Sequence, residues 1–237
     1  MRGPSEVVEG ARPRSGAAVV GLVVGAFVAV ELVILALGWL VTHVLAHGWL
    51  HREELVFEQD VVTYRTSFWN SVTSFGTLIG GTEIVIAMTA VGCLLLFLRG
   101  HSPRLPAFLA VAVVGETTLF VLASIVIHRL RPAIPHLDGA PPTSSFPSGH
   151  TAATVALWCG LAFGLARTHP GHRLRALSWV LAIAVPAFVL VSRLYRGMHW
   201  PTDVAASVVF TLLWLLLLRA VLLPPDRADP PREPLKR

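Results

Sequence analysis

Residues 143–166 read TSSFPSGHTAATVALWCGLAFGLA and join two unlike halves. The second half belongs to an apolar segment, 151–167, that is close to the ~20 residues a helix needs to cross a bilayer. The first half is polar and ends in Pro-Ser-Gly-His. Ionisable side chains are costly inside a membrane and usually carry a function there. The stretch therefore predicts a membrane helix whose first turn holds a functional histidine.

Five other segments share this apolar character. The sequence thus predicts an all-α, polytopic membrane protein with six transmembrane helices in a bundle. The first segment is too long for the apolar core of a signal peptide and lacks a clear cleavage site, so we expect it to be retained. The expected spans are residues 17–46, 78–98, 105–127, 151–167, 176–193 and 202–222.

Composition supports a membrane protein and argues against a nucleic-acid partner. Of the 237 residues 54% are hydrophobic and 14% are charged, against about 25% charged in soluble domains. The formal net charge of +5 comes mostly from arginine. These arginines flank the apolar runs, as residues that set membrane topology do. They do not gather on one soluble face.

Charge also predicts the orientation. With six spans both chain ends lie on the same side, and the loops on that side hold more basic residues than the opposite loops. The positive-inside rule then places both termini on the cytoplasmic side of a cell membrane. The composition favours a bacterial source. We expect residues 1–15 to be a disordered N-terminus, 16–223 the membrane domain, and 224–237 a disordered tail.

The Pro-Ser-Gly-His stretch has the features of an anion site. The first N–H groups of a helix lack internal partners and lie at the positive end of the helix dipole. Ser148 adds a hydroxyl, Gly149 lets the backbone approach an oxyanion, and His150 lies in the first turn. The alternative is an ordinary helix cap.

A second cluster, Ser192 to Asp203, precedes the last span on the same side of the membrane. The four-residue spacing of His199 and Asp203 lets the carboxylate reach one imidazole nitrogen, which leaves the other basic, as in an activated nucleophile. Arg193 supplies a fork of donors for phosphate oxygens. The alternative is a topology arginine beside an interfacial His–Asp pair.

A third cluster adds cationic donors after the third span. Arg131, and less directly Arg129, precede a proline on the same side as both histidines. Together the clusters supply donors for equatorial phosphoryl oxygens, a nucleophile and a proton donor, as phosphoryl transfer requires. No cluster of carboxylates suggests a magnesium site, so we expect metal-independent chemistry without a cofactor.

Over roughly residues 60–222 the sequence resembles the type-2 phosphatidic acid phosphatase superfamily of membrane lipid phosphatases. Its motifs are K-x6-R-P, P-S-G-H and S-R-x5-H-x3-D. The second is present as Pro147-Ser148-Gly149-His150, and the third as Ser192-Arg193, His199 and Asp203. The first keeps Arg131-Pro132, but Ser124 occupies its lysine position.

The resemblance implies a role for each matching residue. His199 attacks phosphorus to form a phosphohistidine, Asp203 orients it, and His150 protonates the leaving group. The phosphoryl oxygens are held by Arg131, Arg193, Ser148 and Gly149. Because serine cannot replace the charge of lysine, Arg129 is a candidate substitute from one turn away. A degenerate, inactive member is the alternative.

The leading functional hypothesis is a phosphatase at the extracytoplasmic face, acting on a lipid phosphate such as a polyprenyl diphosphate, phosphatidic acid or phosphatidylglycerophosphate. The alternative is a transferase that moves the phosphoryl or head group to a lipid or glycan acceptor. A transporter or scaffold is disfavoured because the ionisable residues crowd one face. Of the carboxyls within spans, we expect Glu83 to line a substrate entrance and Glu31 and Glu116 to form interhelical hydrogen bonds.

Overall fold

A computed structural model describes residues 15–98, 102–139, 143–168 and 171–223. The secondary structure of these residues is entirely helical, as predicted. The expected disordered ends, 1–15 and 224–237, lie outside the described residues apart from Ser15. The Oγ of Ser15 accepts a hydrogen bond from the N–H of Ala18, 3.3 Å away, and so caps the first helix.

Among the described residues five helices are long and apolar enough to cross a membrane, and a sixth span results if a bent pair of helices is one span. The first, α1, continues through a π-helical turn and a 3₁₀ turn to His47. The pair α3 and α4 is bent by 50° at Gly80 and Gly81, whereas we expected one helix over 78–98. The helices are α1 (Gly16–Trp39), α2 (Trp49–Thr63), α3 (Ser67–Ile79), α4 (Thr82–Leu98), α5 (Arg104–Val126), α6 (Gly149–Thr168), α7 (His172–Tyr195) and α8 (Pro201–Leu222).

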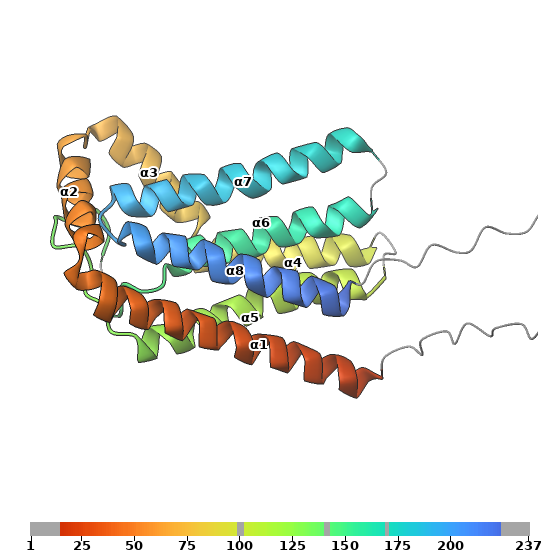
Figure 1. Cartoon of the computed structure of the whole chain (residues 1–237). Helices are drawn as coiled ribbons and strands as arrows, with labels where there is room; N and C mark the ends of the chain where they lie inside the picture. Colours follow the sequence, from red (N-terminus) through yellow and green to blue (C-terminus); the bar gives the residue numbers. More distant parts are fainter. Residues whose placement is uncertain (1–14, 99–101, 140–142, 169–170, 224–237) are drawn as a thin grey trace, which may run out of the picture.

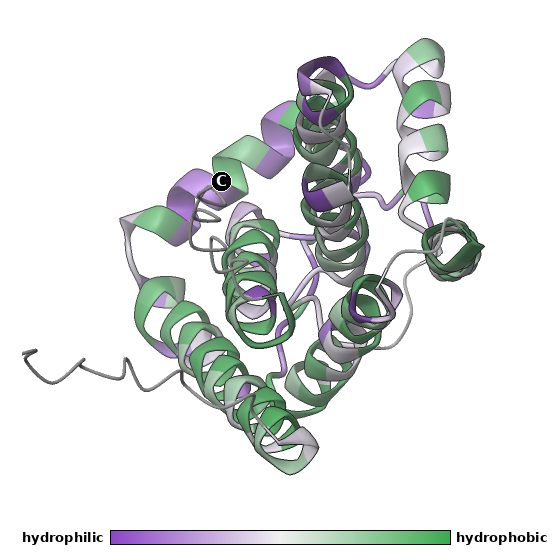
Figure 2. Cartoon of the chain, turned by 90° about the vertical axis from the view of Figure 1, so that its right-hand side faces the viewer, coloured by the Kyte–Doolittle hydropathy of each residue, from purple (hydrophilic) through white to green (hydrophobic). Residues whose placement is uncertain are grey.

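The bundle is centred on α6, which packs against α4, α5, α7 and α8. In its most apolar window 56% of α6 is buried, against 11% for α1 at the edge. Small residues let neighbouring helices approach α6 closely, among them the buried Ala152, Ala156 and Gly160. Many large apolar side chains are exposed, which suits a lipid environment. Most of the helical ribbon is hydrophobic (Figure 2).

The remaining helix, α2, crosses one end of the bundle, opposite the end where α1 begins and α8 ends (Figure 1). Its exposed face mixes charged and apolar residues, which suits a membrane surface. Its other face buries Glu54 and Glu58, which lie four residues apart. The polar stretch of residues 51–72 forms most of α2 and the first half of α3.

Candidate functional site

The three polar clusters meet at the α2 end of the bundle. They come from the loop between α5 and α6, the first turn of α6, and the segment that joins α7 to α8. A cavity of about 710 Å³ opens among them. Of the seven residues predicted for the site, five line this cavity: Arg131, Gly149, His150, Arg193 and His199.

The start of α6 is closely packed at Gly149, so a larger residue there would displace the Phe120 ring. A Cβ atom placed on Gly149 would lie 2.9 Å from Cζ of Phe120 on α5. His150 packs against the break between α3 and α4, since a Cβ on Gly80 would lie 3.2 Å from its Cβ and Cδ2 atoms. The break thus helps to fix His150 at the cavity wall.

Ser148 is fully buried and does not line the cavity. Its N–H donates to Oγ of Ser207 at 2.8 Å, and its Oγ lies 3.0 Å from Oγ1 of Thr151. The structure therefore uses the Ser148 side chain within the helix start, whereas we expected it to contact the phosphoryl group.

His199 is held through one ring nitrogen, and no hydrogen bond to the other is found within the part of the chain that the structure describes. Its Nδ1 lies 2.7 Å from the backbone carbonyl of Ser145. Because a carbonyl oxygen only accepts, Nδ1 carries the proton and Nε2 keeps its lone pair. Burial lowers the pKa of His199 well below its usual value, and the charges of Arg193 and Arg131 lower it further. The imidazole is therefore neutral and its free nitrogen is nucleophilic.

The expected hydrogen bond from the imidazole of His199 to the carboxylate of Asp203 does not form. The Oδ2 atom of Asp203 lies 3.9 Å from Nδ1 of His199, and the Ser145 carbonyl is the closer partner. Asp203 accepts instead from Oγ of Ser145, from the backbone N–H of Trp200 at 3.0 Å, and from Nη1 of Arg129. It therefore acts on His199 through the Ser145 segment. The four-residue spacing alone does not decide the partner of His199, because the Ser145 carbonyl lies closer to Nδ1 than the carboxylate does.

Arg129 belongs to the layer behind the cavity. Its Nη2 donates to Oε2 of Glu54 on α2 at 2.8 Å, and its Nη1 donates to Asp203 and to Oγ1 of Thr202. Oε1 of Glu54 in turn accepts from the N–H and the hydroxyl of Thr202, at 2.9 and 2.6 Å. These bonds fasten α2 to the start of α8.

The suggestion that Arg129 replaces the missing motif lysine is therefore wrong, because Arg129 is paired with carboxylates and does not line the cavity. Ser124 does not line the cavity either, and its Oγ donates to the carbonyl of Val121 at 2.8 Å. Glu54 was missed by the sequence analysis. The four-residue spacing of Glu54 and Glu58, both on one face of a surface helix, was the available signal.

Two arginines that line the cavity, Arg131 and Arg193, each have one N–H donor without a partner among the described residues. Arg131 donates from Nη1 to the carbonyl of Met198 at 2.6 Å, and Arg193 donates from Nη1 to Oγ1 of Thr77 at 3.1 Å. The Nε atoms of both arginines are buried and have no hydrogen-bond partner among the described residues. An anion in the cavity would therefore lie beside two cationic side chains.

An acidic residue that we did not anticipate, Asp138, shares this region. Its Oδ2 accepts from Nη1 of Arg193 at 2.8 Å, and its Oδ1 accepts from Nε of Arg196 at 2.8 Å. Burial alone would raise the pKa of Asp138, but the hydrogen bond from Arg196 and the charges of Arg193 and Arg196 outweigh it and lower the pKa. The ionised carboxylate orients both arginines.

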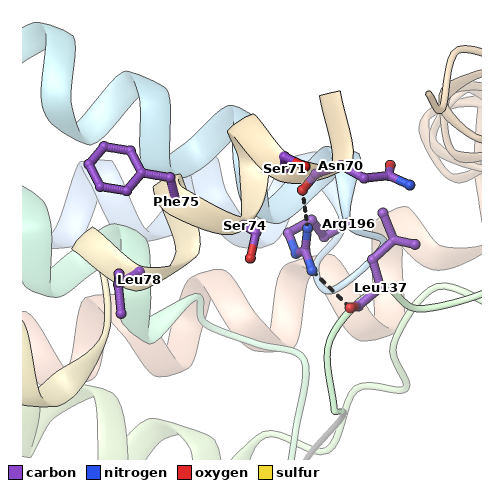
Figure 3. A pocket seen from close by; sticks show the side chains of 7 residues that line it. All are labelled: Asn70, Ser71, Ser74, Phe75, Leu78, Leu137 and Arg196. Carbon is purple, nitrogen blue, oxygen red and sulfur yellow. Dashed lines mark hydrogen bonds between the residues drawn. The ribbon is translucent and has the colours of Figure 1, made fainter. Parts of the chain in front are cut away.

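Arg196 also connects α3 to the loop before α6 (Figure 3). Its Nη1 donates to the carbonyl of Asn70 at 3.0 Å, and its Nη2 donates to the carbonyl of Leu137 at 2.8 Å. A second hollow of about 680 Å³ lies against this crosslink. None of the seven residues predicted for the site lines it, so Arg196 stabilises the wall of the site from outside.

The other end of the main cavity is apolar and reaches the lipid-facing surface. Ile86 on α4 and Val114 on α5 both line the cavity, and they are 61% and 65% exposed. The cavity therefore opens sideways between α4 and α5. Glu83 does not line the cavity, so our expectation for it was wrong, although its neighbour Thr82 does.

Comparison with known proteins gives a consistent set of relatives. The family model of the PAP2 superfamily matches residues 104–224. Undecaprenyl-diphosphatase of Sulfolobus acidocaldarius is 31% identical over 150 residues, which are 62% of this chain and 65% of that protein. Phosphatidylglycerophosphatase B of Haemophilus influenzae is 38% identical over 73 residues, which are 30% of this chain and 29% of that protein. The chain thus spans less than two thirds of the length of either relative.

The fold has a solved counterpart. It resembles the crystal structure of a transmembrane PAP2-type phosphatidylglycerolphosphate phosphatase from Bacillus subtilis with a TM-score of 0.74. The match covers 86% of this chain and 99% of that chain at 20% sequence identity. At this identity the likeness concerns the fold alone.

Proposed function

The chain belongs to the PAP2 superfamily, and we propose that it is an integral-membrane phosphatase that hydrolyses a lipid phosphate through a phosphohistidine. The observation that carries this proposal is the shape of the main cavity. One end holds His150, His199 and two arginines, and the other opens between α4 and α5 toward lipid. A lipid phosphate can enter sideways with its head group at the histidines and its tail in the membrane.

In the first step Nε2 of His199 attacks phosphorus. A nitrogen–phosphorus bond forms and the bond to the leaving oxygen breaks, while His150 gives that oxygen a proton. The hydrogen bond from Nδ1 of His199 to the Ser145 carbonyl supports this step, because it holds the ring in the tautomer whose Nε2 is free. The unpaired Nε donors of Arg131 and Arg193 are placed to stabilise the phosphoryl oxygens.

In the second step water attacks the phosphorus of the phosphohistidine. His150 takes a proton from the water, the nitrogen–phosphorus bond breaks, and inorganic phosphate leaves with His199 neutral again. We assign Asp203 a positioning role, since it holds Ser145 and the start of α8. Ser148 supports the helix start at Gly149, whose backbone lies at the cavity.

We propose that the site faces the extracytoplasmic side and that both termini are cytoplasmic. The positive-inside bias of the loops supports this orientation. We retain residues 16–223 as the catalytic membrane domain. The substrate classes follow the relatives, namely a polyprenyl diphosphate or a phosphatidylglycerophosphate, with phosphatidic acid as a third candidate.

The test is phosphate release by the purified full-length protein in detergent with EDTA present. We expect release from at least one of these three lipids, and we expect His199→Ala to abolish it while EDTA leaves it unchanged. Equal release from wild type and His199→Ala would overturn the proposal. Release that needs an added lipid or glycan alcohol would support the transferase instead. Reintroducing the motif lysine as Ser124→Lys shows whether its loss limits the rate.

A further inference from the structure

One carboxyl group in the membrane lies on the main cavity without a role in the chemistry. Glu116, in the middle of α5, is 1% exposed and lines the cavity. Its Oε2 accepts a long hydrogen bond, 3.4 Å, from Oγ1 of the adjacent Thr117, and its Oε1 has no partner among the described residues. We expected Glu116 to form an interhelical hydrogen bond, and none is found among the described residues.

A buried carboxyl group without a cationic partner is kept neutral, because a lone charge in an apolar medium is very costly. A neutral carboxyl group is both a donor and an acceptor. Leaving such a group unpaired destabilises the protein, and a ligand that pairs with it recovers the loss. Glu116 is thus a carboxyl group in a mostly apolar stretch of the cavity wall, which Val85, Ile86, Val113 and Val114 also line.

The depth of Glu116 identifies the part of a ligand that it would meet. Phe120 on α5 packs against Gly149, so it lies at the level of the phosphoryl site. Glu116 is one helical turn from Phe120 toward the membrane interior, or about 5–6 Å. The first atoms beyond a phosphate ester reach this level when the phosphate lies beside Gly149 and His199.

We propose that the Glu116 carboxyl group donates a hydrogen bond to an ester carbonyl of the substrate, so that the site selects glycerolipid phosphates. This inference rests on the proposed phosphatase function and specifies its substrate class. A glycerolipid places ester carbonyls just beyond its phosphate, whereas a polyprenyl monophosphate presents only C–H and C=C groups there. A site that is built around a hydrogen bond rejects an analogue that cannot form it, because its buried group then stays unpaired.

The test compares three substrates in mixed micelles: phosphatidic acid, its diether analogue without carbonyls, and a polyprenyl phosphate. We expect wild type to prefer the ester to the ether by at least about tenfold in kcat/KM. Glu116→Leu should bring this ratio close to one, and Glu116→Gln, which can still donate, should keep most of it. The polyprenyl substrate should be no better than the ether.

The matched control is Glu31→Leu. Glu31 is another carboxyl group in a span with an unpaired oxygen, but it does not line the cavity, so its loss should leave the ratio unchanged. An ester-to-ether ratio that is the same in wild type and Glu116→Leu overturns the inference alone, provided that hydrolysis still needs His199. No hydrolysis of any substrate by wild type overturns the proposed function and this inference with it.

Discussion

The front and the back of the site differ in how completely their polar groups are paired. At the front, Arg131 and Arg193 line the cavity with Nε donors that have no partner among the described residues. At the back, Glu54, Arg129 and Asp203 bond to one another or to their neighbours. Arg129 and Arg131 are only two residues apart in the sequence, yet they belong to different layers. The front groups are left open for a ligand, and the back groups hold the front in place.

The largest effect is expected at the front. Arg131→Ala should lower kcat/KM by about 10²–10³-fold, because it removes a donor aimed at the phosphoryl oxygens. Arg131→Lys should recover only part of the loss, since an ammonium lacks the planar fork. The measurement is steady-state phosphate release together with the affinity for inorganic phosphate or vanadate. Unchanged affinity in Arg131→Ala would place this arginine in the back layer.

A smaller effect is expected at the back. Glu54→Gln removes the charge that holds Arg129 and the start of α8, so His199 should be less well positioned. We expect kcat to fall about tenfold, with KM nearly unchanged, because the substrate does not touch Glu54. Glu53→Gln, at the exposed neighbouring position, is the control. A rise in KM without a fall in kcat would contradict the division into layers.

The smallest effect concerns stability. Burial raises the pKa of Glu58 on α2 to about 8, although the charge of Arg65 opposes the rise. In the unfolded chain this carboxyl has its ordinary pKa of 4.5, so Glu58 progressively lowers the stability of the fold as pH rises from 4.5 to 8. Glu58→Gln should therefore raise Tm at pH 8 by about 2–4 °C and change it little at pH 4.5.

Thermal unfolding in detergent at both pH values measures this difference. Glu53→Gln again serves as the control and should shift Tm equally little at both. A gain from Glu58→Gln that is as large at pH 4.5 as at pH 8 would show that Glu58 is already ionised in the folded protein.

The spans were predicted well because each of them is a long, nearly uninterrupted run of apolar residues. The expected and observed bounds of α5 and α8 differ by one residue at most. The break between α3 and α4 was missed, since averaging over a long apolar window hides it. The Gly80-Gly81 pair was the local cue, because adjacent glycines favour a turn.

The site was predicted in part, for a physical reason. His150, Arg131 and Arg193 stand in motifs whose spacing can be read directly, and all three reach the cavity. Glu54 was marked only by its four-residue spacing from Glu58, and Asp138 stands in a segment with no spacing signature. The partner of His199 is a backbone carbonyl 54 positions away, which no local pattern reveals.

The central claim is that His199 forms a covalent bond to phosphorus. The most direct measurement is rapid acid-free quenching of the full-length protein with a lipid phosphate labelled at its phosphate group. We predict a labelled protein that is stable in alkali and labile in acid, with the label on His199. The label should be absent from His199→Ala and still form in Glu54→Gln at a lower rate. Label on another residue, or turnover of wild type without any labelled protein, would contradict the account.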